Sequence, residues 1–210
     1  MSEQLSLGGL TSKKGWVSIG YDRTVWIPCL ATFPEGYDRE SYAAEFAQLW
    51  WDSSGLRYGP VDLARLTAMI SEIHQGIYGH IPCHMAFIHL PDPRLMPLVL
   101  YVGIWESDGE HDEQLRMLTH ADDPGAVEPP IVEEFTTGKL GAGLRTMRYR
   151  HLDDGSLYAG LSYAWRCPEY ETDVLLFTSA EDLGRLQRAI PDIDEFARTM
   201  TVIPQKEPHA

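Results

Sequence analysis

The sequence predicts an α+β fold, in which a mainly antiparallel sheet of about six to seven strands is flanked by amphipathic helices. Two observations support this prediction. Apolar residues alternate in some segments and recur every three to four residues in others. The expected strands also come in runs separated by runs of helices, without the regular βαβ alternation of a parallel sheet. Since no linker-like stretch divides the chain, we expect one domain over residues 15–204, preceded by a flexible arm over residues 1–14.

Two short strands are expected at the start of the domain. They cover residues 16–19 and 24–33, and the turn of residues 21–23 joins them. Pro28 lies inside the second strand and cannot donate a ladder hydrogen bond. The second strand is therefore expected at an edge of the sheet or at a bulge.

Two amphipathic helices follow, over residues 39–52 and 61–77. Asp38 is a suitable N-cap for the first helix. Apolar residues at helical spacing predict the buried faces. On the first helix these are Tyr42, Phe46, Leu49 and Trp50, and on the second they are Leu63, Leu66, Met69, Ile70, Ile73 and Ile77.

The middle of the chain predicts a hairpin and then an acidic excursion. Residues 85–90 and 98–105 form the hairpin, and its second strand is apolar on both faces, which is typical of a central strand. The excursion covers residues 107–129 and has the composition of a solvated segment, with a short helix at 113–119. We expect it to be the most mobile internal segment.

The C-terminal part predicts a three-stranded meander followed by helices. Its strands cover residues 144–151, 157–166 and 173–178, and Asp154-Gly155 forms the first turn. A capping sequence at 179–182 begins a helix, and Pro191 is expected to begin another helical turn.

This order of elements resembles the PsbP-like fold. The stretch Glu134–Val202 carries the resemblance, with its meander and closing helix, and covers about a third of the chain. The helix and acidic segment over 61–130 depart from the compact version of that fold. Members of the fold are mostly non-catalytic binding proteins, so the resemblance implies an adaptor, and it assigns no functional residue.

Charge and cysteine content narrow the classes of partner. The net charge of −14 repels nucleic acid and anionic membrane surfaces, so neither is an expected partner. The three cysteines are too few and too far apart for a disulfide framework. The chain has no secretory signal and no apolar stretch of membrane-spanning length, and we therefore expect a cytoplasmic protein.

The densest group of metal-ligand residue types lies between His74 and His89. Zinc needs three or four such ligands in a tetrahedral arrangement. On a strand, Cys83 and His84 would point to opposite faces. We therefore predict no metal site, and keep a metal protein or an enzyme using His80, Cys83 and His84 as the alternative.

Three further patterns in the sequence resemble functional sites. Ser162 lies in a Gly-x-Ser-x-Ala pattern, but in the middle of a strand rather than at a nucleophile elbow. The glycines of Gly138–Gly143 have the wrong spacing for a dinucleotide loop, so no cofactor is expected. Arg148 and Arg150 share a strand face with apolar residues, where they either pack at the rim or bind an anion.

Trp51 lies opposite the expected buried face of its helix. Either another element of the chain covers it, or it is exposed and fits a partner's pocket. With Ala44 and Ala47 beside it, we expect this face to contact a protein partner or a second copy. The sequence thus favours a non-enzymatic binding or adaptor domain that acts through protein–protein contacts.

Overall fold

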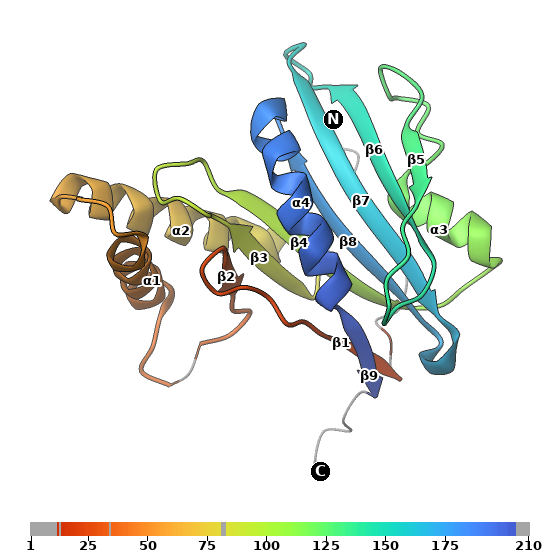
Figure 1. Cartoon of the computed structure of the whole chain (residues 1–210), viewed down its shortest axis with the longest axis horizontal. Coiled ribbons are helices and arrows are strands. Elements are labelled where there is room, and N and C mark those ends of the chain that lie inside the picture. The colour runs from red at the N-terminus through yellow and green to blue at the C-terminus, as the bar shows by residue number, and fades with distance from the viewer. Residues whose placement is uncertain (1–11, 13, 34, 81–82, 205–210) are drawn as a thin grey trace. The chain divides into compact units, whose positions relative to one another are not determined.

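The computed structural model describes Ser12 and residues 14–33, 35–80 and 83–204, without the side chains of residues 78–80. Seven strands form one sheet in the order β2-β3-β4-β8-β7-β6-β5, and β1 and β9 form a separate two-stranded sheet (Figure 1). All the strand pairings with a described register are antiparallel, so the α+β prediction is confirmed. The elements are β1 Gly15–Ser18, β2 Trp26–Cys29, α1 Arg39–Ser54, α2 Pro60–His80, β3 Met85–His89, β4 Leu98–Glu106, α3 His111–Thr119, β5 Ile131–Glu134, β6 Gly143–His151, β7 Leu157–Cys167, the 3₁₀ turn Pro168–Tyr170, β8 Thr172–Ala180, α4 Leu183–Thr199 and β9 Thr201–Pro204.

The chain divides into two compact units. One covers residues 22–100, and we call it the middle unit. The other combines residues up to 21 with those from 101 onward, and we call it the terminal unit. Most of the residues expected to form a flexible arm lie outside the described part of the chain, but Ser12 is buried in the terminal unit and its hydroxyl lies 2.6 Å from that of Thr172.

In the middle unit, side chains of α1 bind the backbone of strands and loops. Asp38 caps the helix as predicted, because its carboxylate accepts the backbone N–H of Ser41. Trp50 donates its indole N–H to the Leu90 carbonyl at 2.6 Å. Trp50 is buried, as its place in the apolar stripe predicts.

The outer strand β2 confirms the prediction made from Pro28. It is the edge strand beside β3, where a residue without an N–H is tolerated. The carbonyl of Pro28 accepts the hydroxyl of Tyr42 from α1, so a side chain of the helix binds this strand. The first expected strand, β1, pairs with β9 from the other end of the chain.

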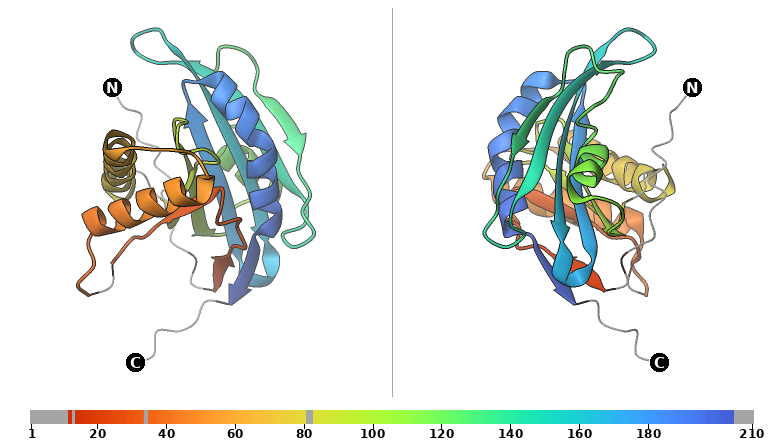
Figure 2. Two further views of the ribbon diagram at one scale, coloured as in Figure 1. Left: turned by 60° about the vertical axis from the view of Figure 1, so that its left-hand side comes forward. Right: turned by 90° about the vertical axis from the view of Figure 1, so that its right-hand side faces the viewer.

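In the terminal unit, α3 and α4 cover opposite faces of the meander (Figure 2). Leu115 and Leu118 of α3 pack against Ala164 of β7, whereas Asp194 of α4 binds Tyr163, the preceding residue of the strand. Successive residues of a strand point to opposite faces. The sheet here is therefore the middle layer of three, and the expected turn over residues 152–156 joins β6 to β7.

Helix α4 is continuous through Pro191, although the sequence predicted a new helical turn there. Pro191 removes one backbone hydrogen bond. The buried face continues on both sides of it, with Leu186 and Ala189 before and Ile193 and Phe196 after. Burial of this face against the sheet outweighs the local cost of the proline.

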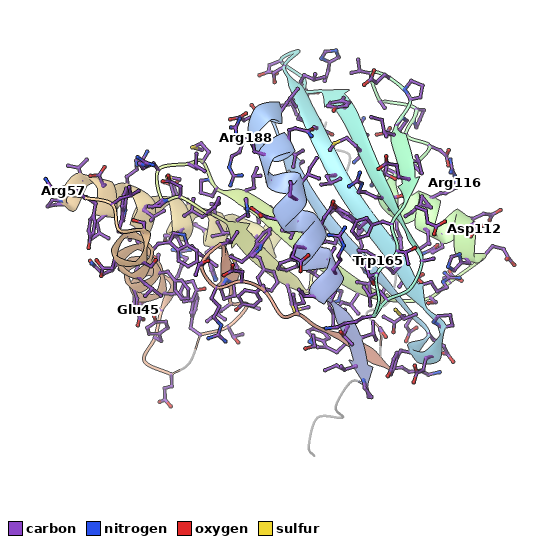
Figure 3. All side chains as sticks on the ribbon, viewed as in Figure 1. Glu45, Arg57, Asp112, Arg116, Trp165 and Arg188 are labelled. Carbon is purple, nitrogen blue, oxygen red and sulfur yellow. The ribbon has the colours of Figure 1, made fainter. Side chains whose placement is uncertain are left out.

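The acidic excursion contributes buried residues to the terminal unit. The expected helix is present as α3, and Leu115, Leu118 and Ala121 are buried. Asp112 and Arg116 lie on its outer side (Figure 3). Charged side chains of α3 thus lie on one side of the helix, and its other side belongs to the core.

Candidate functional site

The surface expected on α1 is buried inside the chain. Trp51 is 1% exposed and Ala47 is fully buried, so only Ala44 of the three predicted contact residues is exposed. Trp51 stacks on Tyr58 with 5.3 Å between the ring centroids. The prediction that Trp51 and Ala47 form a partner surface is therefore wrong.

Trp51 and Ala47 are buried because the buried face of α1 is wider than its apolar spacing predicts. The helix packs on α2 as well as binding the strands through Tyr42 and Trp50. Two contacts bury a wider arc than one, and the arc is centred on Ala43, Ala47 and Trp50. Leu49, expected inside, lies beyond this arc and is 55% exposed.

The His74–His89 region contains packed histidines. His89 is buried against Trp26, with ring centroids 4.7 Å apart, and His74 packs on Phe33 at 4.9 Å. Burial lowers the pKa of His74, and the positive charge of Arg39 lowers it further. Burial and the Arg39 charge therefore both favour the neutral form of the His74 imidazole.

Metal ligation in this region receives no support from the described residues. Within residues 12, 14–33, 35–80 and 83–204, no three His, Cys, Asp or Glu side chains are placed to hold an ion. The side chain of His80 lies outside that description, so the alternative site with Cys83 and His84 stays a prediction. Burial raises the pKa of Cys83 to about 11 and lowers that of His84.

Arg148 and Arg150 do bind an anion, and it belongs to the same chain. The carboxylate of Asp123 forms an ion pair with Arg148 and lies 3.7 Å from Arg150 Nε. The side chain of Asp123 is 8% exposed. Burial raises the pKa of this carboxyl, but hydrogen bonds from Gly125 and Arg148 and the charges of both arginines outweigh burial and hold the pKa below its usual range.

A second polar cluster joins α4 to the other face of the sheet. Tyr163 donates its hydroxyl to Asp194 at 2.6 Å, and Arg145 binds the same carboxylate at 3.1 Å. Burial raises the pKa of Tyr163 strongly, and the Asp194 carboxylate adds to this rise. A buried phenol held in its neutral form is a hydrogen-bond donor, not a base, so this cluster fixes the position of α4.

The remaining sequence patterns are structural. Ser162 lies inside β7, as expected. Gly138–Gly143 contains a tight turn closed by backbone bonds between Thr137 and Gly141, where Gly141 has a φ of 77° that favours glycine. Trp165, labelled in Figure 3, donates its indole N–H to the carbonyl of Phe135, which precedes this turn.

The clearest candidate surface lies along β5, at the other edge of the sheet. Ile131 begins this strand and is 50% exposed. Val127 is 52% exposed and extends the strand, because its N–H bonds the Tyr149 carbonyl of β6. Leu152, at the end of β6, is also exposed. We call Val127, Ile131–Glu134 and Leu152 the β5 edge. Sequence reasoning missed it because β5 has only four residues and follows two prolines.

Comparisons with known proteins assign no family to this chain. No protein-family model matches the sequence, and a search of curated proteins finds no similar sequence. Among the described helices, none combines the length and apolar character needed to cross a bilayer.

Proposed function

We propose that this chain is a non-enzymatic binding protein that recognises a protein partner through the β5 edge. The observation that carries this proposal is the exposure of three apolar side chains at this edge of the sheet, namely Ile131 in β5, Val127 just before it and Leu152 just after the neighbouring β6. Apolar groups gathered on a surface are typical of contact sites, whereas scattered ones need no explanation.

An open strand edge offers a second means of recognition. No described strand pairs with the outer side of β5, so its backbone groups are available to an added strand. The opposite edge strand, β2, is protected by Pro28 and by the hydroxyl of Tyr42 on the Pro28 carbonyl. Strand addition is therefore favoured at β5.

The charge of the β5 edge favours a basic partner over a second copy. Glu128, Glu133 and Glu134 are exposed on or just before β5, and of these Glu133 pairs with Arg145 of β6. Two copies paired through this edge would bring like charges together, which destabilises cross-strand pairs. A partner strand with lysine or arginine would gain complementary contacts and faster association with a chain of net charge −14.

The resemblance of Glu134–Val202 to the PsbP-like fold supports the same class of function, since members of that fold are mostly non-catalytic binding proteins. The alternative use of His80, Cys83 and His84 gains no comparable support, because the described part of the chain brings no three ligand side chains together.

Affinity capture followed by binding measurements tests the proposal. Proteins captured by the wild-type chain are identified and purified, and their dissociation constants are measured for the wild type, Ile131→Lys and Glu134→Lys. Both substitutions place positive charge on the β5 edge, so we expect affinity to fall at least about tenfold. Met117→Lys is the matched control, since Met117 is 56% exposed on α3 and is not a residue of the β5 edge.

The control decides how the result is interpreted. Equal loss of binding in Met117→Lys, or no effect of Ile131→Lys, would contradict recognition through β5. Light scattering on the isolated chain tests self-association. A dimer lost in Ile131→Lys would replace the proposed partner with a second copy.

A further inference from the structure

Four residues form a polar patch on the face of the sheet that α3 covers. Strand register places Thr146 opposite Ser162 and Arg148 opposite Gly160 on β6 and β7. Because side chains alternate, these four residues share the face of Ala164, which packs against α3. We call Thr146, Arg148, Gly160 and Ser162 the α3-side polar patch.

Two polar atoms of this patch are buried without a hydrogen-bond partner among the described residues. They are Oγ1 of Thr146, a residue only 1% exposed, and Nε of Arg148. Buried polar groups are nearly always hydrogen-bonded, and those that are not indicate a bound molecule, a water or strain. Two such donors separated by one residue, on the same face of one strand, point to a common acceptor.

The guanidinium of Arg148 has one edge left for this acceptor. Asp123 takes the Nη1 end, and the edge that contains Nε does not contact it. The Nε edge of a guanidinium suits the two oxygens of a carboxylate or phosphate. A ligand there lies on the other side of the guanidinium from Asp123, which limits charge repulsion.

Glycine at position 160 leaves room beside this edge. A Cβ at Gly160 would lie 3.4 Å from Arg148 Nε and 3.6 Å from its Cγ. Any other residue would place its Cβ in contact with Arg148, whereas glycine adds no side chain beside Nε. Ser162 adds a further hydroxyl beside Thr146 on this face.

We propose that the α3-side polar patch binds a small oxyanion, held by Arg148 Nε and the Thr146 hydroxyl. The class of ligand is a free carboxylate or phosphate, or such a group on a larger molecule. This site is separate from the β5 edge and does not depend on it.

Titration with defined anions tests the site. Calorimetry and thermal melts on the full chain compare sodium acetate, inorganic phosphate and chloride at equal ionic strength. Chloride is the control anion, because it has no oxygen atoms. We expect acetate or phosphate to bind and to raise Tm above the chloride value. Acetate alone would assign a carboxylate, and phosphate alone would assign a phosphate group.

Two substitutions locate the binding. Thr146→Val keeps the shape of the side chain without the hydroxyl and should weaken affinity at least about tenfold. Gly160→Ala should abolish binding without lowering the Tm of the ligand-free chain, because its methyl group makes only ordinary contacts.

Thr178→Val is the matched control. Thr178 is also buried with an unpartnered Oγ1, but its cross-strand neighbour is Leu161, on the other face of the sheet. The Thr178→Val variant should bind acetate or phosphate with the same affinity as the wild type. Absence of oxyanion binding in the wild type, or unchanged affinity in both Thr146→Val and Gly160→Ala, would overturn the proposal and leave a buried water at this position.

Discussion

Trp51 stacks on Tyr58 with 5.3 Å between ring centroids and 23° between ring planes, so the chain itself covers the face of α1 that carries Trp51. Tyr58 follows the helix and comes back to it after the C-cap Gly55, which adopts a left-handed conformation at a φ of 67°. The segment that follows α1 therefore covers Trp51 with Tyr58, on a face that the helix alone would expose.

Trp51→Ala should destabilise the fold by about 3–5 kcal/mol, as large core truncations do. The reason is that the substitution removes a buried indole from the core. Trp50→Ala should lower the free energy of unfolding by a similar amount. Urea unfolding measures both. Ala44→Ser, at an exposed position of the same helix, is the control and should change stability little. If Trp51→Ala unfolds at the same urea concentration as the wild type, the burial described for α1 is wrong.

The pairing of Asp123 with Arg148 should make stability depend on pH in the acid range. Burial raises the pKa of Asp123, but the hydrogen bonds and the arginine charges lower it more, so the net pKa lies below that of the unfolded chain. Such a carboxyl stabilises the fold above its unfolded pKa of about 3.9, and this contribution disappears as the pH falls through the folded pKa.

Urea unfolding of the wild type and Asp123→Asn between neutral pH and about pH 2 measures this contribution. We expect the wild type to be the more stable at neutral pH and the difference to shrink below about pH 4. Asp112→Asn removes a charge from an exposed side chain and serves as the control. A difference that stays constant with pH would show that Asp123 contributes no charge-dependent stability.

Hydrogen exchange should divide the acidic excursion into two parts. Amides in the second half of α3 should be protected nearly as well as those of β7, because Leu115, Leu118 and Thr119 are buried. The amides of residues 125–128 should exchange faster, since these residues are mostly exposed and belong to no helix or strand. Val127 should be the slowest of them, because its N–H bonds the Tyr149 carbonyl. Uniformly fast exchange over 107–129 would instead support the mobility expected from composition.

The local sequence determined most helices and strands of this protein. Helical spacing and the Asp38 cap identified α1, and alternation with Asp154-Gly155 identified the hairpin of β6 and β7. These signals act between residues close in the sequence, through backbone geometry and periodic burial. The α+β class followed from their order.

The tertiary structure decided which faces and edges meet. The pairing of β1 with β9, the covering of Trp51 and the continuation of α4 through Pro191 all depend on burial between distant segments, which outweighs local preference. The same applies to the candidate sites. The sequence identified Arg148 as a possible anion binder, but only the fold brings Asp123 to one end of its guanidinium and leaves a buried Nε at the other, because strand register, not sequence spacing, sets which side chains are neighbours.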